Sequence, residues 1–452
     1  MRKIALPDVF HPTSDEDYLK GAIETAKWIK KHEINDENGR HWAVNCQEGK
    51  KTDEVEETYL SNRTLYSGAA GIGFFFIQLY EVTKDEKYLD EAKKGLEFLI
   101  RTYEPDLSVK PGLHTGTAGE GFLALLLHDK TGEKRYFDHA VRIANDIYDK
   151  AIKEETADGL RIHWKSLYDY MGDGSVISYW IRIFKLTSES KYLTYAKTSL
   201  DSILDLRIED DEKTIHWNLL NVHDYFPEVP DKGIIANFAH GTAGIVYLLT
   251  LYYEASKDEK YLRLAERGIN FLEKIAIRDE NSQIIPYIYL PGEEKPYDVF
   301  YLSLCHGPVG SAVVYRKLYK VTGDEKYLDG YRKFNQALIN AGVPEKRSRG
   351  YWNHCICCGT SGFLLHFLTE TELVPGQVNV SLAARTANTS LNDAYVDDNG
   401  RRWYDAWTRV KPWNVDSNLG LFIGDAGNAS AILSLYAKNK GIRITTLPEF
   451  ED

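Results

Sequence analysis

The sequence predicts an all-α protein folded as an (α/α)7 toroid, a barrel of seven inner and seven outer helices with long loops over one end. Two observations predict this fold. Pairs of glycines three residues apart recur along the chain, and a turn motif that opens an amphipathic helix follows most of them. Because a repeated unit is copied around an axis, equivalent positions in different units can converge in space. The pairs are Gly68/Gly71, Gly116/Gly119, Gly241/Gly244, Gly307/Gly310, Gly359/Gly362 and Gly424/Gly427, with a degenerate member at Gly172-Asp173-Gly174-Ser175.

The segments that follow the glycine pairs predict the inner helices. Residues 72–80, 122–127 and 245–253 are apolar nearly all round, which is typical of a helix buried on every side. Glycine at the start of such a helix fits a tight turn or a close approach of two backbone segments. We therefore expect seven inner helices, beginning near residues 68, 116, 172, 241, 307, 359 and 424.

The turn motif predicts the outer helices. Its first copy is Val82-Thr83-Lys84-Asp85-Glu86-Lys87-Tyr88-Leu89, and it returns near residues 131, 186, 255 and 321. Asp85 is typical of a helix N-cap, and the apolar residues after it recur at helical spacing. Seven outer helices are expected, including residues 14–31 at the N-terminus and residues 376–390.

The order of these elements predicts how the ring closes. The first predicted helix is an outer one and the last, near residues 424–438, is an inner one, so the two would pair and make residues 1–452 a single domain. Strand content should be low. Residues 36–57, 279–301 and 391–418 are loop-like, with room for hairpins, and are long enough to cover one end of the ring.

Composition argues against several classes of function. The 452 residues carry a formal net charge of −12, and an acidic chain repels phosphate backbones and anionic lipids, so neither nucleic acid nor a membrane is an expected partner. No apolar stretch approaches the ~20 residues that span a bilayer, and residues 1–11 lack the apolar core of a signal peptide. Three of the five cysteines fall within residues 355–358, unlike a secreted disulfide framework, so a reducing cytoplasm is predicted.

Metal-binding residue types gather just before three successive glycine pairs. If the inner helices are equivalent, these side chains face the central cavity at the same end of the toroid. Three thiolates on Zn²⁺ leave one tetrahedral position open for substrate or water, and a substrate thiolate there would be electron-rich and nucleophilic. The residues in the two positions before these pairs are Ala239-His240, Cys305-His306 and Cys357-Cys358.

Other interpretations of these residues stay open. Buried cysteines can be inert small hydrophobic residues, and His306 could close a structural zinc site as its fourth ligand. Cys355 is the main rival ligand, although it lies two residues too early for the repeat, and Cys46 has no partner in the sequence. His240 is the best acid–base candidate because imidazole titrates near neutrality, with a structural histidine as the alternative. Asp169 could orient a histidine, position substrate or cap a helix.

The glycine-pair motifs resemble those of the lanthionine synthetase C-like family, over nearly the whole chain from about residue 59 to residue 438. The resemblance implies an α/α toroid with a single zinc ion in its central cavity. It also implies an enzyme that adds a peptide cysteine thiol to dehydroalanine or dehydrobutyrine and so forms a thioether ring. The motifs are Ala239-His240-Gly241-Thr242-Ala243-Gly244, Leu304-Cys305-His306-Gly307-Pro308-Val309-Gly310 and Cys357-Cys358-Gly359-Thr360-Ser361-Gly362.

The resemblance implies roles for individual residues. Cys305 and Cys357 correspond to the first two zinc ligands of the family. Cys358 stands where the third ligand is commonly histidine, which is similar to a Cys-Cys-Gly subgroup. His240 matches the catalytic histidine of the family, and Asp169 matches its acidic residue apart from a shift of one residue.

The implied function is that of a zinc-dependent lanthipeptide cyclase, which forms lanthionine and methyllanthionine rings for antibiotic biosynthesis in the cytoplasm. Tyr301 stands where the family often has an arginine, so stabilisation of the enolate would fall to His306 or to a residue elsewhere in the chain. The implied partners are a dehydrated precursor peptide with its leader, a separate dehydratase or synthetase, and a transporter. Two alternatives stay open: a carbohydrate epimerase or glycosidase, for which paired carboxylates and six-fold repeats would be expected, and a non-catalytic relative that binds zinc or a thiol such as glutathione.

Overall fold

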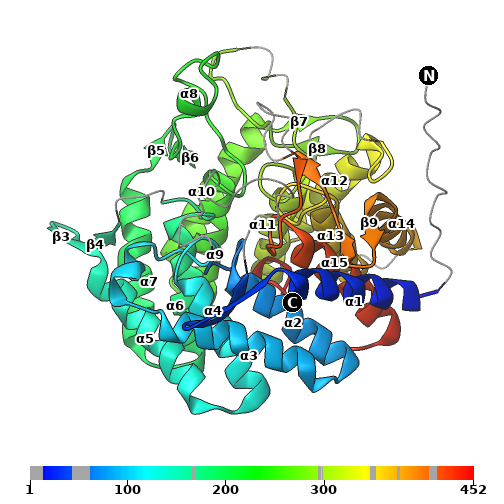
Figure 1. Cartoon of the computed structure of the whole chain (residues 1–452). Helices are drawn as coiled ribbons and strands as arrows, with labels where there is room; N and C mark the ends of the chain where they lie inside the picture. The colour runs from blue at the N-terminus through cyan, green and yellow to red at the C-terminus, as the bar shows by residue number, and fades with distance from the viewer. Residues whose placement is uncertain are drawn as a thin grey trace.

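Helices dominate the computed structural model, which describes residues 14–42, 62–164, 168–293, 297, 299–346, 353–373, 377–406 and 415–451. Seven of the described helices form the inner ring, and each begins one to four residues after its predicted start (Figure 1). They are α2 (Ala69–Thr83), α4 (Ala118–Thr131), α6 (Val176–Thr187), α9 (Thr242–Ser256), α11 (Pro308–Thr322), α13 (Thr360–Leu373) and α15 (Asp425–Lys440).

Seven outer helices surround this ring. Each inner helix contacts the next one in chain order and the outer helix that follows it, and α15 contacts both α2 and α1, which closes the ring. The predicted all-α (α/α)7 toroid is therefore confirmed. The outer helices are α1 (Glu16–Lys31), α3 (Glu86–Arg101), α5 (Lys134–Lys150), α7 (Ser190–Asp205), α10 (Glu259–Ile275), α12 (Glu325–Ala341) and α14 (Gln377–Asp393).

A two-residue turn explains why the turn motif recurs. Its first residue is left-handed and ends the inner helix, with φ of 58° at Lys84 and 69° at Gly323. Its second residue caps the outer helix: the Asp85 side chain accepts a hydrogen bond from the backbone N–H of Lys87 at 3.1 Å. The turn reverses the chain at the end of the toroid that is opposite the glycine pairs.

The glycine pairs are needed because the loop before each inner helix folds back across its first turn. A Cβ atom at Gly310 would lie 2.0 Å from the carbonyl oxygen of Leu304. At Gly427 the same atom would lie 1.7 Å from the carbonyl oxygen of Leu421. No side chain fits in either space, so the repeated glycines report a repeated close approach.

A ring of backbone hydrogen bonds links the repeats at this end of the toroid. One residue of each repeat takes part, and we call these seven residues the ring positions. In six steps the N–H of one ring position donates to the carbonyl oxygen of the neighbouring one, at 2.8–3.1 Å, and in the seventh Thr115 Oγ1 donates to Met171 O at 3.4 Å. The ring positions are Tyr66, His114, Met171, Ala239, Cys305, Cys357 and Phe422.

The third repeat departs from this register by one residue. Met171 lies three residues before Gly174, whereas Ala239 lies two residues before Gly241. The shift expected near the degenerate glycine pair is therefore an extra residue between the ring position and the helix.

The described strands all form two-stranded antiparallel hairpins. Hairpins occur in the three predicted loop regions, although residues 43–61, which make up most of the first region, lie outside the described residues. Two further hairpins, β3–β4 and β5–β6, were not predicted. The pairs are β1 (Glu33–Asp36) with β2 (Gly39–Trp42), β3 (Ile152–Thr156) with β4 (Gly159–His163), β5 (Ile208–Glu209) with β6 (Ile215–His216), β7 (Ile277–Arg278) with β8 (Gln283–Ile284), β9 (Tyr395–Asp397) with β10 (Gly400–Arg402), and β11 (Asp405–Ala406) with β12 (Val415–Asp416).

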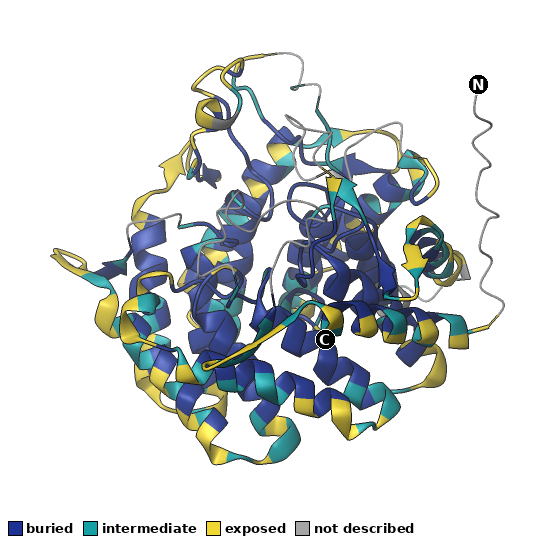
Figure 2. Cartoon of the chain, viewed as in Figure 1, coloured by how far each residue is buried: buried dark blue, intermediate teal, exposed yellow. Residues whose placement is uncertain are grey.

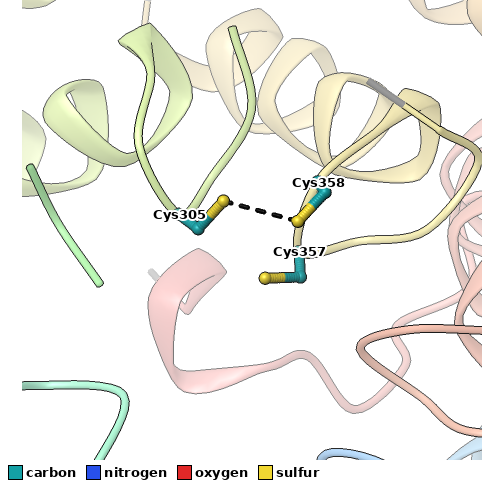
Figure 3. A group of neighbouring side chains, drawn as sticks. All are labelled: Cys305, Cys357 and Cys358. Atoms are coloured by element: carbon teal, nitrogen blue, oxygen red, sulfur yellow. Dashed lines mark hydrogen bonds between the residues drawn. The ribbon is translucent and has the colours of Figure 1, made fainter. Parts of the chain in front are cut away.

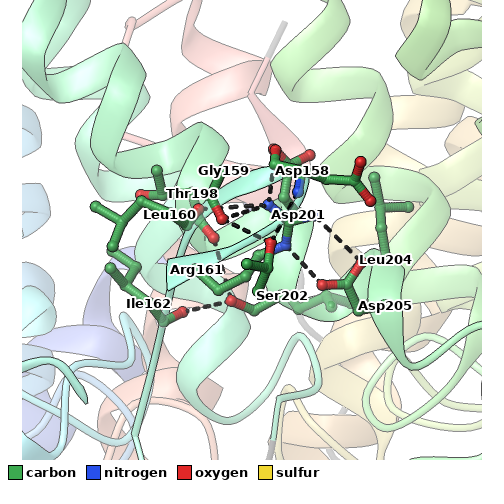
Figure 4. A network of polar contacts seen from close by, with 12 residues as sticks. Asp158, Gly159, Leu160, Arg161, Ile162, Thr198, Asp201, Ser202, Leu204 and Asp205 are labelled. Carbon is green, nitrogen blue, oxygen red and sulfur yellow. Dashed lines mark hydrogen bonds and ion pairs between the residues drawn. The ribbon is translucent and has the colours of Figure 1, made fainter. Parts of the chain in front are cut away.

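Polar contacts fasten the β3–β4 hairpin to α7 (Figure 4). Arg161 Nε donates to Asp205 Oδ2 at 2.6 Å, and Ser202 Oγ donates to the carbonyl oxygen of Ile162 at 2.9 Å. These contacts hold the hairpin against α7.

Burial follows the two layers (Figure 2): the inner helices are buried on every side, and the outer helices expose one face. A second, smaller hydrophobic cluster lies apart from the main core, around α8 (Val222–Tyr225) and the loop that contains Tyr287 and Ile288. Among the described helices, none combines the length and the apolar character that spanning a bilayer requires.

The chain continues beyond the last inner helix into a segment that the sequence did not predict to be structured. It ends in the 3-10 helix η4 (Pro448–Phe450), in which Glu449 is 1% exposed and Phe450 is 8% exposed. We call residues 442–451 the C-terminal segment.

Candidate functional site

The three predicted ligands lie together (Figure 3). Cys305 precedes α11, whereas Cys357 and Cys358 precede α13, and their sulfurs are all within 4.8 Å of one another. The Sγ atoms of Cys305 and Cys358 are 3.5 Å apart. The ring of backbone hydrogen bonds produces this placement, because Cys305 and Cys357 are neighbouring ring positions joined by an N–H to carbonyl bond of 3.1 Å. In the part of the chain that the structure describes, no other such group of candidate metal ligands occurs.

The protonation of these thiols favours a bound cation. Hydrogen bonds from Cys305 and Cys358 hold the pKa of Cys357 well below its usual value. Hydrogen bonding to Cys357 raises the pKa of Cys305, and hydrogen bonding to Cys305 raises that of Cys358. One thiolate with two neighbouring thiols is what three adjacent sulfurs can adopt by themselves, because three buried negative charges would repel one another.

The donor set fits a thiophilic divalent metal such as zinc. Zn–S bonds of about 2.3 Å in a tetrahedron separate the sulfurs by about 3.8 Å, which is close to the spacing of this group. Soft thiolate ligands select zinc and similar metals over magnesium or calcium. A metal ion would allow all three thiols to ionise, and three protein ligands would leave a fourth position open.

The rival ligands are not part of the three-sulfur group. The sulfur of Cys355 accepts a hydrogen bond from the backbone N–H of Cys358 at 3.3 Å. The ring of His306 packs against Tyr287 and Tyr301, at centroid distances of 4.8 and 5.4 Å. Cys46 lies outside the described residues.

His240 and Asp169 form a hydrogen-bonded pair. His240 Nδ1 lies 2.8 Å from Asp169 Oδ2, and the fully buried carboxylate also accepts the backbone N–H of Gly172 at 2.6 Å. Asp169 therefore both orients the histidine and stabilises its own turn. Burial lowers the pKa of His240, but the hydrogen bond and the charge of Asp169, with a smaller contribution from Cys357, raise it above its usual value. Because Asp169 occupies Nδ1, Nε2 is the atom left to exchange a proton.

His306 lies beside this pair. Its ring centroid is 5.3 Å from that of His240, and its Nδ1 has no hydrogen-bond partner among the described residues. Burial holds the pKa of His306 well below its usual value, so its imidazole is neutral. It suits hydrogen bonding to a substrate better than donating a proton.

One further residue at this end was not predicted as part of the site. Tyr66 is the ring position of the first repeat, and its ring stacks on Phe422 at 5.6 Å. Burial first, and then the charges of the cysteines, raise the pKa of Tyr66 well above its usual value. The register that located the cysteines could have located Tyr66 as well, since all of them are ring positions or their neighbours.

A cavity of about 970 Å³ lies at the other end of the toroid. Residues near the C-terminal ends of the inner helices line it, among them Gln78, Lys130 and Arg182. None of the predicted site residues lines this cavity, so the candidate chemistry belongs to the glycine-pair end.

Residues 60–444 match a family model described as "Lanthionine synthetase C-like protein". The chain belongs to this family. In lanthionine synthetase C-like proteins as a group, lanthionine cyclases stand beside non-catalytic members, so membership does not by itself establish an activity.

Solved structures share the fold of this lanthionine synthetase C-like chain. Nisin cyclase is 16% identical, with a TM-score of 0.62, and the match covers 86% of this chain and 92% of that one. The Lin0763 protein from Listeria innocua is 13% identical, with a TM-score of 0.51, and covers 95% of this chain and 99% of its own. At these identities the likeness concerns the toroid.

Proposed function

We propose that the protein is a zinc-dependent lanthipeptide cyclase, which adds cysteine thiols of a peptide to dehydroalanine or dehydrobutyrine. One observation carries this proposal: a group of three sulfurs that could hold a metal ion shares one end of the toroid with a histidine–carboxylate pair. The first supplies a site for a nucleophilic thiolate, and the second supplies a proton donor.

Cys305, Cys357 and Cys358 would hold the zinc ion. When bound, zinc would lower the pKa of a peptide thiol and keep it in place as a thiolate. The new carbon–sulfur bond forms at the β-carbon of the dehydrated residue, while the electrons of its double bond move to Cα and the neighbouring carbonyl oxygen. His240, charged as the imidazolium with its Nδ1–H held by Asp169, then gives the proton of Nε2 to Cα and is left as the neutral Nδ1–H imidazole. The proton lost by the thiol balances the proton gained by Cα.

His306 suits the stabilisation of the negative oxygen. It lies beside His240, and its buried ring nitrogen without a partner among the described residues could donate one hydrogen bond to that oxygen once substrate is present. Tyr287 and Tyr301 pack on its ring and limit its rotation.

The biological setting forms part of the proposal. The substrate would be a dehydrated precursor peptide with its leader, supplied by a separate dehydratase or synthetase and exported by a transporter. Four described cysteines are free thiols, which fits work in the reducing cytoplasm.

The decisive experiment incubates the zinc-loaded protein with a dehydrated peptide that contains cysteine. Cyclisation leaves the peptide mass unchanged but removes the free thiol, so subsequent alkylation adds no mass. A peptide that remains fully alkylatable would overturn the proposal. If the peptide thiol resists alkylation only until the protein is denatured, the non-catalytic thiol-binding alternative is favoured instead. The carbohydrate alternative finds no support in the candidate residues, which are mainly thiols and imidazoles rather than paired carboxylates.

A further inference from the structure

The C-terminal segment enters the toroid from the end opposite the cysteines. Glu81, near the end of α2, accepts hydrogen bonds from Thr445 N at 2.6 Å and from Thr445 Oγ1 at 2.7 Å. Gln78 Nε2 donates to the carbonyl oxygen of Thr445 at 2.7 Å. Leu447 and Phe450 then join the hydrophobic core. The segment is thus an extended peptide bound inside its own barrel.

Glu449 reaches the inner side of the ring of backbone hydrogen bonds. Its Oε1 lies 2.6 Å from Nε2 of His114, which is a ring position, and accepts a hydrogen bond from the hydroxyl of Tyr170 at 2.8 Å. Arg316 Nη2 donates to the carbonyl oxygen of Glu449 at 2.6 Å. Glu449, His114 and Tyr170 are all buried, so the carboxylate bonds to two different inner repeats, and the backbone of Glu449 bonds to a third through Arg316.

Tyr170 connects this carboxylate with the acid–base pair. It lies between Asp169, which contacts His240, and Met171, whose N–H donates to the carbonyl oxygen of Ala239 at 3.0 Å. Residues 169–171 therefore link the two sites: Tyr170 bonds to Glu449, whereas Asp169 and Met171 bond to His240 and Ala239. The Tyr170 ring also packs on Phe238, at a centroid distance of 4.6 Å.

We propose that Glu449 is a positioning residue for the reaction: by anchoring Tyr170 it keeps Asp169 and His240 in the geometry that proton transfer requires. The C-terminal segment is then part of the acid–base machinery as well as of the core. The inference rests on the proposed function, because it takes His240 as the proton donor.

The energetics of the buried carboxylate support a rigid arrangement. Burial raises the pKa of Glu449, but the charge and hydrogen bond of His114 and the hydroxyl of Tyr170 lower it below its usual value overall. Removing a partner of a buried ion is strongly destabilising, so these partners favour one geometry. Misplacing a catalytic group by about 1 Å can slow a reaction by about 100-fold, so a modest shift at Asp169 would suffice.

Tyr170→Phe is the cleanest test, because it deletes the linking hydroxyl and keeps the ring. Zinc content and the far-ultraviolet spectrum should match wild type, while cyclisation of the dehydrated peptide slows by about 10-fold or more. Glu449→Gln, which keeps the shape but loses the charge, should act in the same direction. The matched control is Tyr192→Phe, since Tyr192 is equally buried on α7 and its hydroxyl has no partner among the described residues.

A double-mutant cycle separates positioning from general destabilisation. If Glu449 and Tyr170 act through His240, Tyr170→Phe should cause no further loss in a His240→Ala background. Full additivity of the two losses would overturn the proposal. So would a cyclisation rate in Tyr170→Phe equal to that of wild type.

A measurement without substrate distinguishes failure of this inference from failure of the proposed function. Nitrogen-15 chemical shifts of the His240 ring, assigned by comparison with His240→Ala, report which nitrogen carries the proton. At a pH above the His240 pKa, where the ring is neutral, we expect the zinc-loaded wild type to keep its proton on Nδ1 beside Asp169, and Tyr170→Phe to show a mixture of tautomers. Unchanged shifts would refute the positioning link even if the wild type cyclises, whereas changed shifts in a protein that does not cyclise would uphold the link and refute the cyclase.

Discussion

At the residue scale, the register within the repeat decides which sulfur can bind a metal. Cys305 and Cys357 are neighbouring ring positions, and Cys358 follows one of them, so the backbones of two repeats set where the three sulfurs lie. Cys355 lies only two residues before Cys357, yet its sulfur accepts the N–H of Cys358. Cys355 has the same side chain as the three candidate ligands, but its different position in the repeat makes it a structural thiol.

This register predicts the outcome of single cysteine substitutions. Changing Cys305, Cys357 or Cys358 to Ala should each reduce bound zinc from about one ion per chain to nearly none, because two thiolates do not make a stable site. Elemental analysis of reduced protein measures this. Cys355→Ala and Cys46→Ala are the controls and should keep the metal. Zinc retained by Cys358→Ala would assign the third ligand to Cys355 or His306.

A second prediction at this scale concerns proton transfer. His240→Ala should keep zinc and fold but slow cyclisation by ~10²–10⁴-fold, the usual contribution of general acid catalysis. Uncyclised peptide should accumulate and be visible as an alkylation mass shift. The control is His128→Ala, which should cyclise normally, because His128 is in the last turn of α4 and so lies at the end of the toroid opposite the cysteines. Loss of zinc from His240→Ala would make His240 a ligand, and a normal rate would return it to a structural role.

At the scale of elements, the helices and turns that recur in each repeat could be predicted from the sequence, whereas the segments that occur once could not. The seven glycine pairs and the five copies of the capping turn located twelve of the fourteen toroid helices, because each marks a repeated backbone event; α1 and α14 were predicted without a copy of the turn. The same register brought the three cysteines together and placed His240 in the repeat next to that of Cys305. The C-terminal segment has no counterpart in other repeats, so nothing in the pattern of the sequence located Glu449 inside the barrel.

The loop before α13, which contains Cys357 and Cys358, has a second contact that the repeat pattern does not predict. His354, three residues before Cys357, lies between Asp405 on β11, at 2.7 Å from Nδ1, and Asp393 at the end of α14, at 3.2 Å from Nε2. Burial lowers the pKa of His354, but the two carboxylates raise it to about 9 overall. Its partners are 39 and 51 residues away and unrelated by the repeat.

This contact predicts a pH dependence of stability. A histidine with a folded pKa of about 9 and an unfolded pKa near 6.5 stabilises the fold fully below pH 6.5, and this stabilisation is lost as the pH rises to about 9. The shift corresponds to about 3 kcal/mol as an upper limit. Urea unfolding of wild type and His354→Gln should therefore differ most near pH 6 and converge near pH 9.5. A difference that stays constant with pH would show that His354 contributes by packing alone.

At the scale of the whole molecule, the toroid is a solenoid whose two ends meet. Asp425, the first residue of α15, accepts hydrogen bonds from Trp28 Nε1 of α1 at 3.0 Å, from Ser417 Oγ at 2.6 Å and from Trp403 N at 2.9 Å. Burial raises the pKa of Asp425 to about 7, even though these donors oppose the shift. One carboxylate thus joins the first helix, the last helix and the loop before it.

The closure predicts that a single polar change can open the ring locally. In Asp425→Asn the amide group must face at least one of the three donors, which should destabilise the fold by about 1–3 kcal/mol. The inner helices that α1 contacts are α15, at this junction, and α2. Hydrogen exchange should therefore increase first in α1, while α9 on the opposite side of the ring keeps its protection. Asp138→Asn, which changes an exposed carboxylate on α5, is the control and should leave exchange unchanged, since surface ion pairs contribute little. Exchange that increases equally in α1 and α9 would mean that the ring opens only by global unfolding, and that closure is a property of the whole barrel rather than of Asp425.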